Sequence, residues 1–397
     1  MQRARSFTLR AAASVVIVVS GLVLSGCESE SGPGTVHPVE SRIPHFDDPD
    51  HTIHTARGST DGAMSTLRTA LRSPSWTVGT RDGRAPERFA DIRDVVQNGK
   101  GRVLVLDNEH REVRLFSSDG EYVGAFGREG EAPGEFQYPA HLDRLSDGTI
   151  MVVDRMGRIQ FFASADSAYE RTGGFRVEYT PEDACVLNDT IYLHGMLAKQ
   201  TRKSIHAYTR GGKRTTSFGP VYEDEELFIR RMVSSGSIAC DDSAQTVAFA
   251  FNGAGMVYGY DPSGTRTWVS RLKPFDPMPR EEKTRDGRPS SLHRSEPGTD
   301  LLVGLTDAPG PGLVAQRERF PPKDAEEAAT AVTTYWISAQ TGNGAYVGDG
   351  TLGGPAAGPI AHISSRQVFS VASVPFPRVD AYDSRDVEWK QMGGGDE

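Results

Sequence analysis

The chain has 397 residues and a formal net charge of −9, with 43 glycines and only 37% hydrophobic residues. The acidic balance excludes a general nucleic-acid-binding protein, because such proteins need a basic surface. High glycine with modest hydrophobic content is typical of a chain built from many short strands and turns.

The N-terminus has the three parts of an export signal in order. Arg3, Arg5 and Arg10 form a basic region, and Ala11 to Leu24 form an apolar stretch that is short for a membrane span. Leu24-Ser25-Gly26-Cys27 follows and resembles the lipobox of bacterial lipoproteins. The resemblance implies a signal peptide over residues 1–26, cleavage before Cys27 and lipid attachment to it. An ordinary signal peptide or an uncleaved anchor is the alternative.

Residues 27–75 form the second segment, which is rich in Ser, Gly, Pro, His, Asp and Thr. Few large apolar residues are available to offset the entropy of ordering, so we expect a disordered, flexible tether after the lipidated cysteine. Four histidines in it suggest a metal site, but the flanking Pro and Asp residues favour a solvated linker. These histidines are His37, His45, His51 and His54.

The stretch from Gly99 to Pro139 is the best-formed unit of the chain. Val103 to Leu106 is a continuous apolar run, which predicts a strand covered on both faces. Glu112 to Phe116 and Tyr122 to Phe126 predict two more strands, with an Asp119-Gly120 hairpin turn between them. A small antiparallel sheet that is covered on both faces needs a neighbour on each side, and a β-propeller provides both neighbours.

The exit of this unit carries a known pattern of glycines. Gly127, Gly130 and Gly134 precede Phe136 and Pro139, and we expect Phe136 to fill an apolar gap between two blades. The unit resembles the NHL-type repeat of six-bladed propellers. Over a wider range, from about Ala85 to Phe162, the chain is similar to bacterial six-bladed propeller lipoproteins. The resemblance implies an all-β fold, a six-bladed β-propeller of four-stranded antiparallel blades.

Weaker copies of the unit follow. At roughly 40–50 residues per blade, residues 76–397 are long enough for six or seven blades. Ser75 to Gly79 predicts a strand that closes the ring on the last blade. Lys273 to Gly298 predicts a mobile excursion between the fourth and fifth repeats. One apolar strand marks each repeat: Val103–Asp107, Ile150–Asp154, Ile191–His194, Val247–Phe251, Leu301–Leu305 and Val368–Ala372.

Two cysteines remain after Cys27. Cys185 and Cys240 occupy similar places in successive repeats, near the predicted inner strands. An exported protein can form a disulfide bond, so the two either pair with each other or stay as two buried free thiols.

Candidate chemistry is sparse. Asp107 and Asp154 end matching strands, which favours hydrogen bonds to turn amides over a metal or acid role. His141 and His362 lie near inner strands, where two imidazoles would face the central channel. Six-bladed amidating lyases bind zinc with channel histidines, and six-bladed lactonases bind a divalent ion with acidic and amide groups. A zinc site needs a third protein ligand, and the candidates are His194, His206 and Cys240.

Two functions remain open. The first is a non-enzymatic binding or scaffold module in the cell envelope, held on the membrane by its N-terminal lipid, without a cofactor, and contacting a protein, peptide or glycan. It would be periplasmic, on the outer membrane or on the cell surface. The second is a metal-dependent hydrolase or lyase, lactonase-like or amidating-lyase-like, with zinc or calcium in the central channel. The sequence contains no nucleophile elbow, zincin motif or phosphate loop, which favours the binding module.

Overall fold

A computed structural model describes most of the chain after the N-terminus. The described residues are 35–37, 42–55, 62–83, 85–165, 168–196, 202–224, 227–277, 280–285, 288–293, 298–319, 331–349, 358–373, 375–389 and 392. The predicted signal peptide over residues 1–26 and the predicted lipidation site at Cys27 lie outside these ranges.

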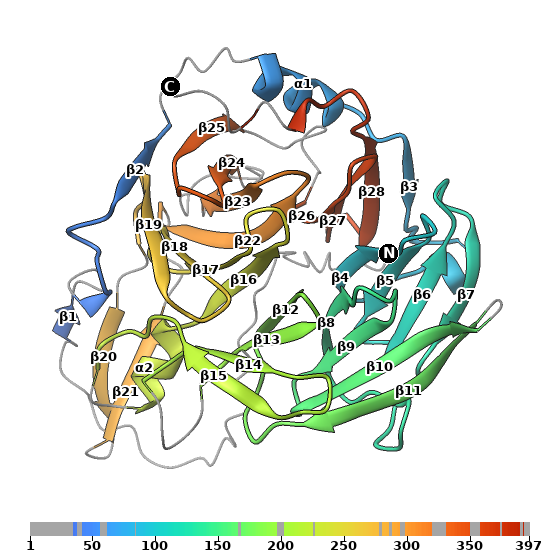
Figure 1. The fold of residues 1–397 in the computed structure, drawn as a ribbon, viewed down its shortest axis with the longest axis horizontal. Coiled ribbons are helices and arrows are strands. Elements are labelled where there is room, and N and C mark those ends of the chain that lie inside the picture. The colour runs from blue at the N-terminus through green and yellow to red at the C-terminus, as the bar shows by residue number, and fades with distance from the viewer. Residues whose placement is uncertain are drawn as a thin grey trace, which may run out of the picture.

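Six antiparallel sheets are arranged around a central axis, each with its first strand innermost (Figure 1). Blade 1 consists of β4 (Ile92–Gln97), β5 (Val103–Asp107), β6 (Glu112–Phe116) and β7 (Tyr122–Phe126). Blade 2 consists of β8 (Pro139–Arg144), β9 (Ile150–Asp154), β10 (Arg158–Ala165) and β11 (Ala168–Arg176). Blade 3 consists of β12 (Asp183–Leu187), β13 (Thr190–His194), β14 (Ile205–Tyr208) and β15 (Arg214–Phe218).

The remaining three blades repeat this order. Blade 4 contains β16 (Gly236–Asp241), β17 (Thr246–Phe251), β18 (Met256–Tyr260) and β19 (Arg266–Lys273). Blade 5 contains β22 (Asp300–Ala308), β23 (Gly312–Arg319), β24 (Ala331–Ser338) and β25 (Gly344–Asp349). Blade 6 contains β26 (Ile360–Ile363), β27 (Gln367–Ala372), β28 (Arg378–Asp383) and β3 (Trp76–Val78). The predicted six-bladed propeller of four-stranded antiparallel blades is therefore confirmed.

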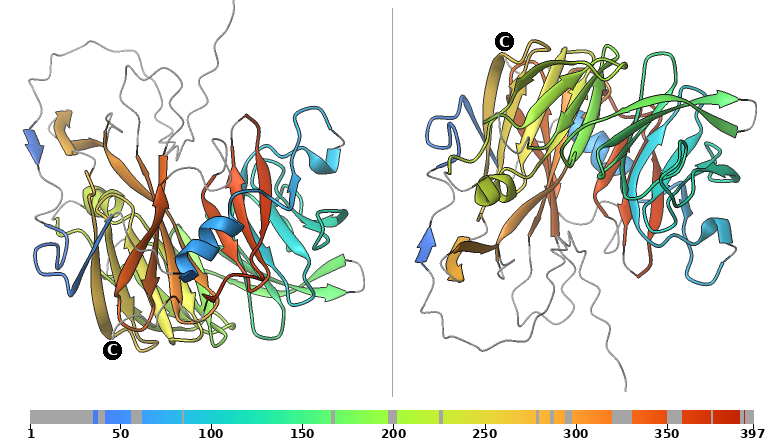
Figure 2. Two further views of the ribbon diagram at one scale, coloured as in Figure 1. Left: turned by 90° about the horizontal axis from the view of Figure 1, so that it is seen from above. Right: turned by 90° about the horizontal axis from the view of Figure 1, so that it is seen from below.

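The second strand of a blade is the most apolar one. All five residues of β5 and all five of β9 are buried, because neighbouring blades cover both faces of the sheet. In blades 1 to 5 the pairing of the third strand with the fourth shifts by a residue, which is a β-bulge that increases the local twist. The side views in Figure 2 show the twisted sheets standing around the axis.

Phe136 fills the gap between blades 1 and 2 as expected. Its side chain is fully buried in a cluster that includes Leu104 of blade 1 and Phe162 of blade 2. The loop before it needs glycine at Gly127, which has φ +86°, and a Cβ atom there would lie 2.1 Å from the Phe136 ring.

The ring closes between the two ends of the propeller. Strand β3 pairs antiparallel with β28, with Val78 opposite Val379 and Trp76 opposite Ala381. The prediction that Ser75 to Gly79 supplies the closing strand is confirmed.

The expected tether differs from the structure over its second half. Residues 42–55, which we call the strap, cross the rim of blade 4, where β2 (His51–His54) adds a fifth strand parallel to β19. Ile43 and Phe46 are buried in the core of blades 3 and 4, and Ile53 in that of blades 4 and 5. Three buried anchors and a strand ladder are enough to order a segment of otherwise polar composition.

Two short helices and a hairpin accompany the blades. Helix α1 (Gly62–Ala70) buries Leu67 against blades 5 and 6, and α2 (Leu227–Val233) lies between blades 3 and 4. The predicted mobile excursion contains the hairpin β20 (Arg280–Arg285) and β21 (Arg288–His293), and β1 (Thr35–His37) pairs with β20. Within the ranges described, neither helix is long and apolar enough to cross a membrane.

The marker strand predicted for the fifth repeat is misplaced by one strand. Leu301–Leu305 belongs to β22, the first strand of blade 5, whereas the markers of the other five repeats are second strands. The equivalent strand β23 contains Gln316, Arg317 and Glu318, all buried, so it lacks a continuous apolar run.

Candidate functional site

Asp107 and Asp154 have the structural role that their recurrence indicated. The Asp107 carboxylate accepts hydrogen bonds from the amides of Ala90 and Asp91 at 3.0 and 3.2 Å. The Asp154 carboxylate accepts the amides of Gln137 and Tyr138 at 2.7 and 3.2 Å. Each aspartate thus ties the end of a second strand to the entry of the first strand in the same blade.

A second set of carboxylates lies around the central axis, where the six first strands contact one another in sequence. Three aspartates from blades 1, 2 and 3 form the same pair of hydrogen bonds. Each carboxylate accepts the amide of the residue that follows it and the amide of a residue on the next blade. The second bonds are Leu142 to Asp94 at 2.8 Å, Val186 to Asp143 at 2.7 Å and Ile238 to Asp183 at 2.9 Å.

An amide side chain performs the same task between blades 5 and 6. The amide of Ile360 on β26 donates to Oε1 of Gln316 on β23 at 2.5 Å. These bonds connect neighbouring blades near the axis, so the residues that form them serve assembly of the ring. In the sequence, the single aspartates of β4, β8 and β12 are not distinguishable from surface acids, so this set was not predicted.

Burial and mutual repulsion change the acidity of this group. Burial raises the pKa of Asp143 to about 7, against the opposing effect of its two amide donors. Burial, followed by the charges of Asp143 and Asp241, raises the pKa of Asp307 to about 7. Burial also raises the pKa of Asp94 well above its usual range, and the nearby charge of Asp183 adds to the rise. The axis is therefore an acidic region that solvent reaches only in part.

His141 lies on β8 within this acidic region. Its Nε2 is 2.5 Å from the carbonyl oxygen of Glu182, to which it donates a hydrogen bond. Its Nδ1 is 3.1 Å from an oxygen of Asp183 and 3.9 Å from one of Asp94. Both ring nitrogens thus face oxygen atoms of the protein, which come from blades 1 and 3 and the loop before β12.

His362 lies on β26 of blade 6 and stacks on Phe369 with ring centroids 6.1 Å apart. Burial, and then the positive charge of Arg144, lower the pKa of His362 to about 4, so its imidazole is neutral at pH 7. The structure gives His141 and His362 different polar surroundings and no shared partner among the residues it describes.

The candidate third ligands for a metal have other partners. The buried ring of His194 has Nδ1 3.0 Å from the carbonyl oxygen of Ser204. The buried ring of His206 contacts the Ser217 hydroxyl at 2.8 Å and the Gly195 carbonyl at 3.0 Å. In the part of the chain that the structure describes, no three His, Cys, Asp or Glu residues are grouped to hold a metal ion.

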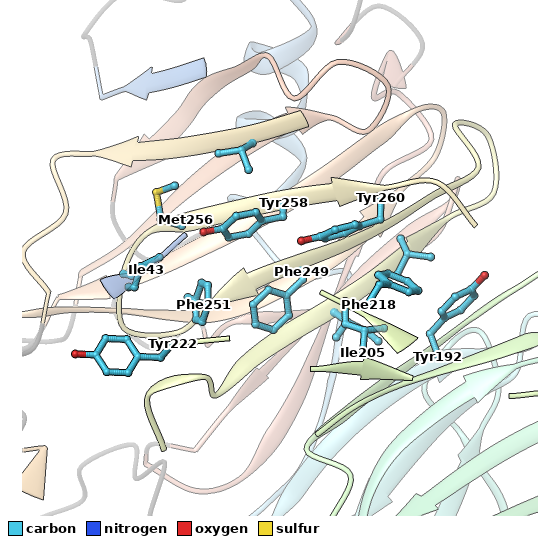
Figure 3. Close-up of a cluster of buried hydrophobic side chains, with 14 of the residues drawn as sticks. Ile43, Tyr192, Ile205, Phe218, Tyr222, Phe249, Phe251, Met256, Tyr258 and Tyr260 are labelled. Atoms are coloured by element: carbon cyan, nitrogen blue, oxygen red, sulfur yellow. The ribbon is translucent and has the colours of Figure 1, made fainter. Parts of the chain in front are cut away.

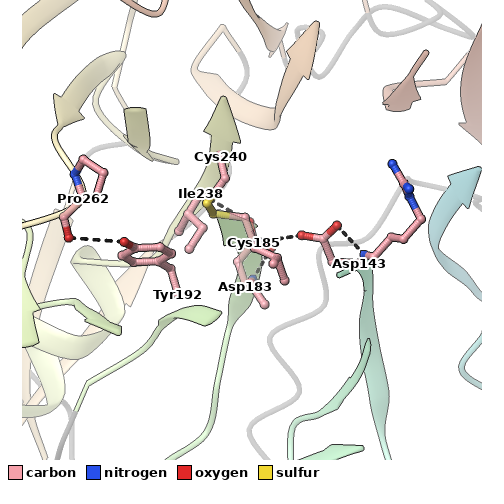
Figure 4. The surroundings of a disulfide bond; sticks show 10 residues. Asp143, Asp183, Cys185, Tyr192, Ile238, Cys240 and Pro262 are labelled. Carbon is pink, nitrogen blue, oxygen red and sulfur yellow. Dashed lines mark hydrogen bonds between the residues drawn. A yellow bond between two sulfur atoms is a disulfide. The ribbon is translucent and has the colours of Figure 1, made fainter. Parts of the chain in front are cut away.

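Cys240 is joined to Cys185 by a disulfide bond, with an S–S distance of 2.02 Å and Cα atoms 5.6 Å apart (Figure 4). The bond connects β12 of blade 3 to β16 of blade 4. Figure 4 also shows Asp143 beside it, accepting the hydrogen bonds described above. This pairing removes Cys240 from the set of candidate metal ligands.

Large apolar side chains are exposed at one end of blade 2. Tyr138 is 51% exposed and Met156 is 47% exposed, and the amide of Arg155 donates to the Tyr138 carbonyl. The guanidinium of Arg111 lies 5.0 Å from the centre of the Tyr138 ring, and that of Arg176 contacts the Met156 carbonyl at 3.4 Å. We call these five residues the Tyr138 patch, which combines exposed apolar surface with three arginines on an acidic chain.

Comparisons with known proteins agree with the fold. The family model DUF5128, described as a 6-bladed beta-propeller, matches residues 89–219, about a third of the chain. No curated protein matches the sequence. The chain is similar to a protein of Bacteroides fragilis NCTC 9343 described as exported, at 10% identity and a TM-score of 0.51, over 82% of this chain and 88% of that one.

Two further structures are similar at low identity. A member of the duf4221 family from Bacteroides vulgatus is 8% identical, with a TM-score of 0.52, over 77% of this chain and 95% of that one. Virginiamycin B lyase from Staphylococcus aureus is 11% identical over 78% of this chain and 98% of that one, but its TM-score of 0.44 is too low to carry an argument. At these identities the likeness shows the propeller fold alone.

Proposed function

We propose that this propeller is a non-enzymatic binding module of the cell envelope, anchored by lipid at Cys27 and contacting a protein, peptide or glycan through one face. The observation that carries the proposal is the use of the axial groups. The carboxylates of Asp94, Asp143 and Asp183 accept hydrogen bonds from neighbouring blades. The ring of His141 contacts Glu182 and Asp183. Groups committed in this way support the ring, which favours a binding module over an enzyme with its site at the axis.

The Tyr138 patch is the contact surface that we assign to a macromolecular partner. Exposed aromatic, methionine and arginine side chains are the residue types enriched at protein interfaces. Three arginines beside an exposed tyrosine favour a partner that presents acidic groups, and the module needs no cofactor for such a contact.

A photo-crosslinking residue tests this surface in the full chain in its own cells. Placed at Met156, it should give a discrete covalent product. Placed at Tyr122, which is 44% exposed on β7 of blade 1, it should not. A Tyr138→Ser/Met156→Ser variant should lose the partner without a change in Tm. Equal products at both positions would contradict the proposal.

Location and anchoring are tested separately. Wild-type chain should incorporate radiolabelled palmitate and sediment with membranes, whereas Cys27→Ala should do neither. Label retained in Cys27→Ala would contradict anchoring at that residue.

One observation favours the enzymatic alternative. Carboxyl groups with raised pKa values, such as Asp143 and Asp307, are common in active sites, and a metal-dependent hydrolase or lyase could use zinc or calcium near them. Metal content of the purified chain decides between the two functions. We expect no stoichiometric metal, whereas zinc or calcium that is lost in His141→Ala would favour the enzyme.

A further inference from the structure

A pocket of about 370 Å³ opens at the rim of the molecule, between the outer strand of blade 3 and the third and fourth strands of blade 4. Its floor is the aromatic region seen in Figure 3, where Phe218 and Tyr260 meet with ring centroids 5.1 Å apart. The strap lines the pocket at Pro44 and His45, and the segment after β15 lines it at Pro220. The pocket is separate from both the axis and the Tyr138 patch.

The strap wall is firmly held before any ligand arrives. The Tyr258 hydroxyl donates a hydrogen bond to the Pro44 carbonyl. The guanidinium of Arg271 lies 3.7 Å from the centre of the Phe46 ring, and Arg42 forms an ion pair with Asp224 at 2.6 Å. A preformed wall lowers the entropic cost of binding, because little needs to be ordered when the ligand enters.

The charge of the pocket is opposite to that of the whole chain. Arg202, Lys203 and Arg266 line it together with a single acid, Glu223, whereas the chain as a whole has a net charge of −9. All four side chains are exposed. Three cations around one opening create a local positive potential that attracts an anionic group.

The remaining lining favours a hydroxyl-rich ligand. The Glu223 carboxylate and the His45 ring can bond to hydroxyl groups, while Pro44 and Pro220 offer apolar surface for a C–H face. A volume near 370 Å³ lies at the lower end of the range for small-molecule pockets.

An extended peptide fits this place less well. Peptides that bind beside a propeller blade would add to a free strand edge. The edge of β19 in blade 4 is already occupied, because β2 pairs with it over four residues from His51 to His54.

We propose that this pocket binds an acidic saccharide, whose carboxylate or phosphate lies among Arg202, Lys203 and Arg266 and whose ring hydroxyls face Glu223 and His45. The proposal rests on the proposed function in one respect, that the propeller is a binding module, and it adds a second site with a stated ligand class.

Calorimetric titration of the purified full-length chain tests the proposal with five probes: glucuronate, glucose 6-phosphate, glucose, inorganic phosphate and an acetylated triglutamate peptide. We expect one or both sugar acids to bind at least about tenfold more tightly than the other three. Binding should weaken as salt is added, because the charged groups are exposed. Whichever of glucuronate and glucose 6-phosphate binds with higher affinity identifies the acid group that the three cations prefer, carboxylate or phosphate.

The matched variants are Lys203→Gln/Arg266→Gln in the pocket and Arg385→Gln on blade 6, where Arg385 is an exposed arginine 71% accessible at its side chain. The pocket variant should weaken sugar-acid binding by at least about tenfold, and Arg385→Gln should not change it. The proposal would be overturned if neither sugar acid bound, or if phosphate, glucose or the peptide bound as tightly as the stronger of the two sugar acids. If sugar-acid binding failed in this way but the crosslinked product at Met156 still formed, only the saccharide proposal would be overturned, and the proposed binding function would still be supported.

Discussion

Aspartates of the inner strands differ in what balances their charge. Asp94, Asp143 and Asp183 each accept two amide hydrogen bonds, which favour the ionised form and oppose the effect of burial. The pKa of Asp307 is raised by burial and then by the charges of Asp143 and Asp241. Since its pKa is about 7 in the folded chain and about 3.9 when unfolded, the folded state keeps the proton over the pH range between the two values.

Asp307→Asn should therefore change the pH dependence of stability. A raised pKa contributes stability that is present below the unfolded value and is lost as pH rises through the folded value. We expect the stability of the variant relative to wild type to be greater at pH 8 than at pH 5, by about 1–2 kcal/mol, because the folded state gives up its proton only near pH 7. Urea unfolding at both pH values measures this, with exposed Asp119→Asn as the control. An equal difference at the two pH values would refute the assignment.

The second strands of the blades are the elements that the sequence predicts best. β5 and β9 are recognisable because burial on both faces demands unbroken apolar runs. β23 lacks such an apolar run, because its buried Gln316 accepts a hydrogen bond from Ile360 of the next blade. The order of the strap is not predictable from an apolar run either, because it depends on three residues that are buried in cores formed by distant parts of the chain.

The candidate site is predicted less well than the fold. His141 is correctly expected near the inner strands, but its partners come from β4, β12 and the loop before β12. Such contacts depend on how the blades are placed around the axis, and no local pattern encodes that placement. The rim pocket likewise combines residues from four separate stretches of chain.

Strand β3 contributes more than its three residues suggest, because it supplies the fourth strand of blade 6 from the N-terminal side of the chain. Thr77→Pro should lower the free energy of unfolding by about 2 kcal/mol or more, through loss of ladder bonds and of the Thr77 bond to Asp380 at 2.7 Å. Thr52→Pro in β2 is the matched control, since that exposed edge strand does not close the ring. Chemical denaturation compares them, and an equal cost would contradict a closing role for β3.

At the scale of the whole molecule, the ring is secured at two places on its circumference. Strand β3 closes it at blade 6, and the disulfide bond together with the strap holds blades 3 and 4. The bond joins residues 55 apart in sequence, so it restricts a long loop in the unfolded chain.

Removal of that bond should destabilise the propeller. Cys185→Ser/Cys240→Ser should lose about 2–4 kcal/mol of unfolding free energy, as should wild type unfolded with reductant present. Thiol titration of the denatured, unreduced chain should detect neither cysteine. Two titratable thiols would show that the pair is free, and equal stability with and without reductant would show that the bond does not contribute.

The pairing of β3 with β28 also sets an order of events during synthesis. A ribosome completes β3 some 300 residues before it reaches β28, whose bounds are Arg378–Asp383. Blades 1 to 5 can each assemble from neighbouring segments as they emerge, while blade 6 waits for the end of the chain. Contacts between such distant segments form slowly. Any chain that ends before residue 378 therefore lacks the partner of β3 and leaves blade 6 incomplete.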